Sequence, residues 1–89
     1  MSWKVRAHPL LKNDLEKLDK HDRLIIRKMI DKIREIPERY KRLKHFTDFY
    51  SVRAKNFRVI YFLEENTIFL LIVGSRKRVY KEMKKRMEE

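Results

Sequence analysis

The sequence contains no cysteine, only one glycine and two prolines among its 89 residues. Without cysteine there are no disulfides and no cysteine-ligated metal site, which fits a reducing cytoplasm. The scarcity of glycine and proline argues against linkers and disorder. No apolar run approaches the roughly 20 residues that cross a bilayer, and the first residues lack a signal-peptide pattern. We therefore expect one cytoplasmic domain over residues 1–89, with no membrane contact.

Positive charge dominates what is present. The chain carries 24 lysines and arginines against 13 acidic residues, a formal net charge of +11. The excess is larger in residues 41–89, which hold 13 basic and 6 acidic side chains. Such a balance favours a polyanionic partner: RNA, DNA or an acidic protein. The alternative is a basic surface with no nucleic-acid role.

Hydrophobic periodicity predicts the element order β-α-α-β-β-β-α. The second helix is the clearest, with Asp22 as its expected N-cap and Pro37 ending it. We expect an α+β domain: a small antiparallel sheet with two N-terminal helices on one face, and a C-terminal helix. The expected strands cover residues 3–6, 48–54, 57–63 and 67–73, and the expected helices lie within residues 7–20, 22–37 and 75–89.

A two-residue turn at Lys55 and Asn56 is expected to join the second and third strands. This turn places Arg53 directly opposite Arg58 on one face of the sheet. Like charges in that position repel, so an anion between them is the simplest reason for the pair. The other face of the hairpin is apolar enough to pack on helices, whereas the arginine face is expected to meet solvent or a ligand.

Two further side chains are expected to join this pair. Arg76 follows the last strand and Tyr80 lies in the first turn of the last helix, so both come close to Arg53 and Arg58 if the sheet is a meander. Guanidinium groups bind phosphate through two hydrogen bonds, and tyrosine stacks on bases or donates a hydrogen bond. The functional interpretation is an RNA-phosphate site; the alternative is a set of separate solvated charges. The three histidines are scattered, so we expect no metal and no cofactor.

Three segments, "LEKLDKHDRLIIRKMIDKI", "YSVRAKNFRVIY" and "IVGSRKRVY", together with the element order, resemble the RelE/ParE toxin superfamily, and the RelE branch more closely. The resemblance implies a RelE-like toxin of a toxin–antitoxin pair. RelE-type toxins are endoribonucleases (mRNA interferases) that cleave mRNA in the ribosomal A site without a metal. The RNA 2′-hydroxyl attacks its own 3′ phosphate, and translation is inhibited. The implied partners are an acidic RelB-like antitoxin, in a hetero-oligomer, and the ribosome with bound mRNA.

The resemblance also implies roles for individual residues. The implied catalytic residues are Arg53, Arg58, Arg76 and Tyr80, and the implied RNA contacts are Lys44, Ser51, Lys55 and Arg78. Ser51 stands where well-studied bacterial members carry a lysine, and arginine is a poor proton acceptor. The general base therefore stays open among Lys44, His45, Lys55 and Tyr80.

Two other functions remain open at this point: a ParE-like inhibitor of gyrase and a non-catalytic nucleic-acid-binding module.

The packing of the last helix is also left open. Val79, Met83 and Met87 recur at a spacing of four residues and form an apolar stripe. Methionine serves both adaptable cores and adaptable interfaces, so the stripe packs either in the core or against the antitoxin.

Overall fold

A computed structural model describes residues 3–44 and 48–88. The expected order of helices and strands is confirmed, with a short 3-10 helix η1 (Pro37–Arg39) added after the second helix. Within the described residues, no helix has the length and apolar character needed to span a bilayer. The elements are β1 (Lys4–Ala7), α1 (Leu11–Glu16), α2 (Lys20–Glu35), β2 (Phe49–Ala54), β3 (Phe57–Glu64), β4 (Thr67–Ser75) and α3 (Arg76–Met87).

The sheet has the strand order β1-β4-β3-β2. β2, β3 and β4 form the expected antiparallel meander, and the predicted hairpin register is confirmed, with Arg53 opposite Arg58. β1 differs from the expectation of an antiparallel sheet because it runs parallel to β4. Parallel strands need a long connection. Residues 8–66, which contain α1, α2, β2 and β3, connect β1 to β4.

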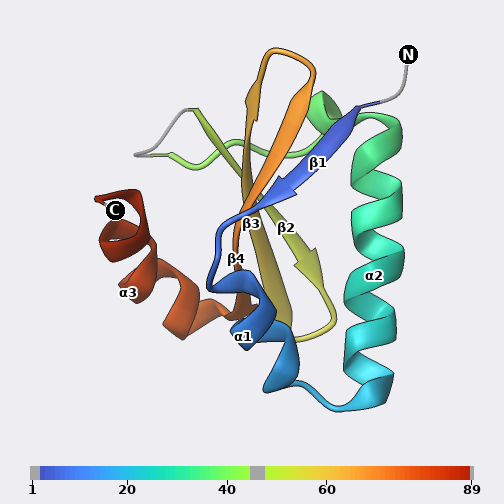
Figure 1. Cartoon of the computed structure of the whole chain (residues 1–89), viewed down its shortest axis with the longest axis vertical. Coiled ribbons are helices and arrows are strands. Elements are labelled where there is room, and N and C mark those ends of the chain that lie inside the picture. Colours follow the sequence, from blue (N-terminus) through green and yellow to red (C-terminus); the bar gives the residue numbers. More distant parts are fainter. Residues whose placement is uncertain (1–2, 45–47, 89) are drawn as a thin grey trace.

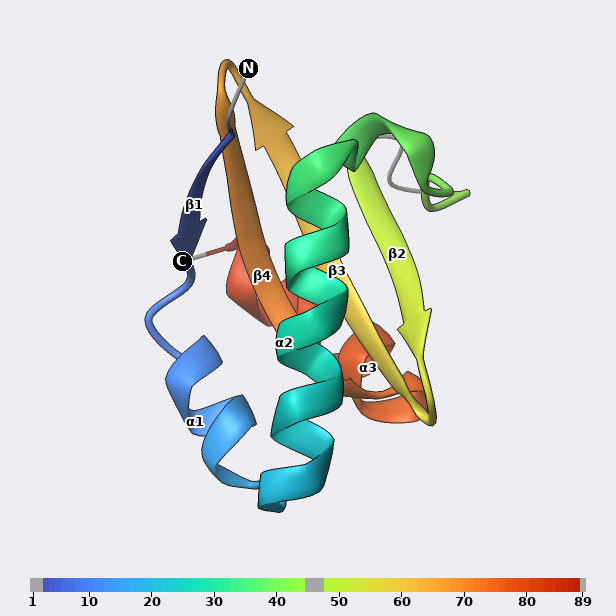
Figure 2. The same ribbon diagram turned by 90° about the vertical axis from the view of Figure 1, so that its right-hand side faces the viewer.

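The helices cover both faces of the sheet. Figures 1 and 2 show α2 running along one face while α3 lies on the opposite side. Asp19, rather than the expected Asp22, is the N-cap of α2 and accepts a hydrogen bond from the Asp22 N–H at 2.8 Å. The helix ends at Glu35, as the proline two residues later predicts.

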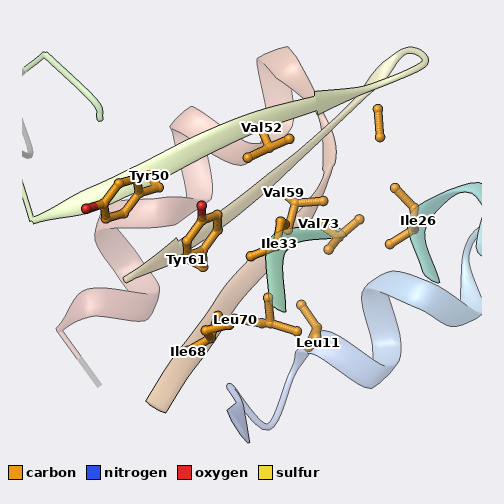
Figure 3. Close-up of a cluster of buried hydrophobic side chains, with 11 residues drawn as sticks. Leu11, Ile26, Ile33, Tyr50, Val52, Val59, Tyr61, Ile68, Leu70 and Val73 are labelled. Carbon is orange, nitrogen blue, oxygen red and sulfur yellow. The ribbon is translucent and has the colours of Figure 1, made fainter. Parts of the chain in front are cut away.

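The larger core lies between the sheet and the two N-terminal helices. Ile26 and Ile33 of α2 are fully buried there against residues of all three meander strands. Figure 3 shows Tyr50 and Tyr61 within this cluster, where their rings stack with centroids 5.1 Å apart. The Tyr61 hydroxyl donates to the Pro37 carbonyl at 2.7 Å, and burial raises the pKa of this phenol well above its ordinary value. This bond joins η1, which follows α2, to β3 of the sheet.

A second core lies under α3. It contains Ile60, Leu71, Ile72, Val79 and Met83, so part of the face expected to meet solvent or a ligand is covered instead. The stripe on the last helix is therefore divided: its first two members are core residues, whereas Met87 is 40% exposed. A β-bulge between β3 and β4 leaves Leu71 without an opposite residue, which allows two consecutive β4 residues to join this core.

Candidate anion-binding site

A cavity of about 310 Å³ opens beside the second core, where β2, β3 and the start of α3 meet. Among the residues that line it, five are basic and none is acidic. The guanidinium of one of the five, Arg42, is engaged by Tyr50: its Nε donates to the Tyr50 hydroxyl at 3.3 Å. Such a concentration of positive charge favours a bound anion. The lining residues are Lys41, Arg42, Leu43, Lys44, Ser51, Arg58, Arg76 and Tyr80.

Arg58 and Arg76 reach the cavity from neighbouring segments. Arg58 lies on β3 opposite Gly74 of β4, two residues before α3 begins at Arg76. The Ser75 side chain caps this helix and accepts a hydrogen bond from the Arg78 N–H at 3.4 Å. The unsatisfied N–H groups of the first turn add partial positive charge beside the two guanidinium groups. The pairing of Arg58 with Gly74 and the start of α3 at Arg76 therefore bring both arginines to the same cavity.

Tyr80 closes one side of the cavity. Its hydroxyl lies 3.1 Å from the Ser51 Oγ, a hydrogen bond in which either oxygen can donate. This bond links the first turns of α3 to β2. Tyr80 is 38% exposed, so its ring remains accessible to a ligand. Ser51 thus has a structural partner in Tyr80.

The opposed arginines do not line the cavity together. Arg53 is exposed, is not among the cavity-lining residues and donates from Nε to the Lys55 carbonyl at 3.1 Å. Arg58, on the adjacent strand, lines the cavity. The two side chains therefore lie in different surroundings. Arg58 lines the candidate site, whereas Arg53 does not.

Two other expected RNA contacts lie elsewhere. The Lys55 Nζ forms an ion pair with Asp22 of α2 at 2.9 Å, which ties the hairpin turn to the opposite face of the sheet. The Arg78 guanidinium is bound to Asp14 at 2.8 Å and to Glu82 at 3.2 Å, away from the cavity. Neither residue lines the cavity. His45 lies outside the described residues.

Lys41 and Arg42 line the cavity, although neither is among the site residues expected from the sequence. The Ser51 N–H donates to the Lys41 carbonyl and the Leu43 N–H to the Phe49 carbonyl, so this segment pairs with the outer edge of β2. The run "KRLK" was the available signal, but its position beside the site depends on this pairing. Within the described residues, no three acidic or histidine side chains gather closely enough to hold a metal ion.

A model of the ParE toxin of type II toxin–antitoxin systems, parDE, matches residues 5–80 of the chain. The chain belongs to this toxin family. The resemblance to the RelE/ParE superfamily is thus confirmed, with a match that includes every cavity-lining residue. A search of curated proteins found no match to this ParE-family chain.

Solved structures of RelE toxins share the fold of this ParE-family chain. A double arginine-to-alanine mutant of the E. coli toxin RelE in the free state matches with a TM-score of 0.81 and 22% identity, covering 98% of this chain and 99% of that one. RelE in the RelE–RelB complex from Pyrococcus horikoshii OT3 matches with a TM-score of 0.72 and 24% identity, over 88% and 99%. The RelB–RelE complex from Methanococcus jannaschii gives 0.69 and 21%, over 85% and 95%. The α+β, RelE-like fold is confirmed.

Proposed function

We propose that this toxin is a metal-independent endoribonuclease that cleaves mRNA in the ribosomal A site and so inhibits translation in the cytoplasm. The observation that carries the proposal is the basic cavity, in which Arg58, Arg76 and the start of α3 surround one space with Tyr80 at its side. Loss of a single preorganised donor to a developing anion typically costs about 2.7–4 kcal/mol, so such an arrangement suits phosphoryl chemistry.

In the proposed reaction, the RNA 2′-oxygen bonds to the adjacent phosphorus while the bond from phosphorus to the 5′ oxygen breaks. The 2′-hydroxyl loses a proton and the departing 5′ oxygen gains one, leaving a cyclic phosphate and a 5′-hydroxyl. Arg58 and Arg76 would stabilise the charge on the non-bridging phosphate oxygens. Tyr80, oriented by Ser51, would donate to the 5′ oxygen or stack on a base.

The positions of the candidate residues favour one lysine over another as the general base that accepts the 2′-hydroxyl proton. Lys44 lines the cavity, whereas Lys55 is held by Asp22 on the far side of the hairpin. We therefore favour Lys44 over Lys55 as the base, with orientation and charge stabilisation supplying much of the rate. Arg53, outside the cavity but adjacent to Arg58, is proposed to attract the flanking RNA backbone rather than the reacting phosphate.

We also propose an acidic, RelB-like antitoxin as the partner in a toxin–antitoxin hetero-oligomer. RelE toxins of similar fold are found in complexes with RelB from P. horikoshii and M. jannaschii. The net charge of +11 favours an acidic segment that orders on binding. On this chain, coverage of the basic cavity would block RNA directly.

A second candidate function rests on one observation: the matching family model is that of ParE rather than RelE. ParE-type members inhibit gyrase, which would make the target a protein instead of RNA. In this alternative the basic cavity would bind acidic side chains.

Primer extension on an mRNA translated in vitro, with and without the toxin, tests the proposal. We expect codon-phased cuts that appear only when the message is being translated. Arg58→Ala should abolish most cutting, while Arg27→Ala, an equal loss of charge on the exposed side of α2, should not. An intact message together with inhibited gyrase supercoiling would contradict the ribonuclease proposal and support the ParE-like alternative.

A further inference from the structure

A buried carboxylate joins α1 to the far end of the chain. The Asp14 side chain is fully buried and accepts hydrogen bonds from the Arg86 guanidinium at 2.6 and 2.7 Å and from Arg78 at 2.8 Å. It also accepts from the Val73 N–H at 3.1 Å. Glu82 lies between the two arginines on α3 and contacts both, at 3.2 and 3.5 Å. We call Asp14, Arg78 and Arg86 the ion-pair clamp.

The clamp occupies the edge of β4 that β1 leaves open. The pair Ala7 and Leu70 is the last between these strands, and in the described chain no strand continues that edge. There the clamp arginines donate to the Leu71 and Val73 carbonyls, at 3.0 and 3.1 Å, and the clamp carboxylate accepts the neighbouring N–H. The clamp therefore satisfies backbone groups that a strand would otherwise pair.

α3 carries the clamp and the candidate site on opposite sides of its core face. Successive residues turn by about 100° around a helix axis. Val79 and Met83 consequently form the middle of the buried face, with Arg76 and Tyr80 to one side and the clamp arginines to the other. A rotation of α3 that loosened the clamp would swing the cavity residues by the same angle.

The apolar core contacts of α3 and the ion pairs of the clamp constrain this rotation differently. Burial of apolar side chains is non-directional, so the core face sets how closely α3 approaches the sheet but only weakly sets its rotation. A bidentate pair between a guanidinium and a carboxylate is strongly directional. Because Asp14 is itself bonded to the β4 backbone, the clamp relates α3 to the strand beside the cavity.

We propose that Asp14 and Arg86 are positioning residues for the anion-binding site, and that they hold α3 in the rotation at which Tyr80 reaches Ser51 and Arg76 enters the cavity. As far as it concerns RNA cleavage, this inference rests on the proposed function. None of the three clamp residues lines the cavity. The clamp acts through the helix, from the side opposite to the site.

Arg86→Lys is the decisive variant because it keeps the buried positive charge but removes the planar guanidinium group, which donates two hydrogen bonds to the carboxylate. Arg34→Lys, at an exposed position on α2, is the matched control. Since a displacement of about 1 Å can lower a rate by roughly 10²-fold, we expect kcat of Arg86→Lys to fall about 10–100-fold. KM should change little, because Arg58 and the basic residues from 41 to 44 still bind the substrate.

A second measurement is independent of cleavage. The Tyr80 ring resonance in tyrosine-labelled protein should shift in Arg86→Lys toward its value in Ser51→Ala, which lacks the hydroxyl partner. Inorganic phosphate should also perturb the Tyr80 resonance less in the variant than in the wild type. If Arg86→Lys does not fold, Arg78→Lys replaces it, because the Arg78 side chain is 26% exposed and its loss is better tolerated.

The outcomes separate the two proposals. A folded clamp variant with an unchanged Tyr80 resonance and unchanged kcat would overturn the positioning role. A wild-type protein that cleaves no message would overturn the ribonuclease proposal, while the Tyr80 resonance and the phosphate titration would still decide whether the clamp positions the site. A shifted resonance with reduced kcat supports both.

Discussion

Replacing Asp14 with asparagine should destabilise the fold more than any exposed substitution. The Asp14 side chain is fully buried, and that of its partner Arg86 is 4% exposed. Asp14→Asn therefore leaves a buried guanidinium whose remaining carboxylate is that of Glu82, at 3.5 Å and 39% exposed. Breaking such a pair by removing one partner costs about 3–5 kcal/mol. A domain of this size has a total stability of only about 5–13 kcal/mol, at roughly 0.05–0.15 kcal/mol per residue. The variant should therefore be close to unfolding at moderate temperature.

The same substitution at a second aspartate provides the control. Asp22 pairs with Lys55 at 2.9 Å, but the Lys55 side chain is 47% exposed and the pair lies at the surface. Exposed pairs contribute about 0–1 kcal/mol, so Asp22→Asn should have little effect. Urea denaturation of both variants and the wild type, followed by circular dichroism, measures the difference. A loss below about 1 kcal/mol in Asp14→Asn, close to that of the control, would refute the reasoning.

The pH dependence gives the prediction a second test. Burial opposes the charge of the Asp14 carboxyl, but hydrogen bonds from Arg86, Arg78 and the Val73 N–H hold its pKa below the ordinary value of 3.8. The folded state therefore binds fewer protons than the unfolded state in that range. The stabilisation of the folded state by the ionised Asp14 carboxyl is fully present at pH values above its ordinary pKa. It is lost as the pH falls through the lowered pKa of the folded state. The difference in the free energy of unfolding between the wild type and Asp14→Asn should accordingly shrink in acid. If this difference stayed constant down to strongly acidic pH, it would contradict the pKa shift.

The remaining predictions concern the candidate site. Arg58→Ala should lower the cleavage rate by about 10²–10³-fold, or about 2.7–4 kcal/mol. Its melting temperature should equal or slightly exceed that of the wild type, because a like-charged neighbour of Arg53 is removed. A variant that melts early but cleaves normally would show that Arg58 is structural. Affinity for single-stranded RNA should fall with salt at a slope of about −0.7 per neutralised phosphate in a plot of the logarithms, and a flat salt titration would contradict the basic cavity. Tyr80→Phe should lower kcat more than Ser51→Ala if the hydroxyl transfers a proton, and equal losses would indicate that orientation alone matters.

Much of the architecture follows from local sequence. The apolar spacing of α2 and the proline after it define that helix, and the two-residue turn sets the register of the β2–β3 hairpin, including Arg53 opposite Arg58. These features depend on residues close together in the chain, where periodicity and turn chemistry act directly. The cap of α3 at Ser75 is equally local. For the same reason the element order and the α+β class were predictable.

The site itself depends on contacts between distant residues. Arg76 and Arg78 are two positions apart, yet the rotation of α3 sends the first to the cavity and the second to Asp14, 64 residues away in the sequence. Arg86 meets the same carboxylate across 72 residues. No periodicity identifies such partners, since pairing of a buried charge depends on which side chains the packed elements bring within hydrogen-bonding distance.

The sequence by itself determined which elements form, how the hairpin pairs and how much positive charge the chain carries. Only the tertiary structure decided which cations share the cavity, that β1 joins the sheet in parallel, and that Val79 and Met83 are core residues. The physical reason is that helix and hairpin formation depend on neighbouring residues. The direction of a side chain depends on the rotation of its whole helix against the sheet, which long-range packing and the buried Asp14 determine together.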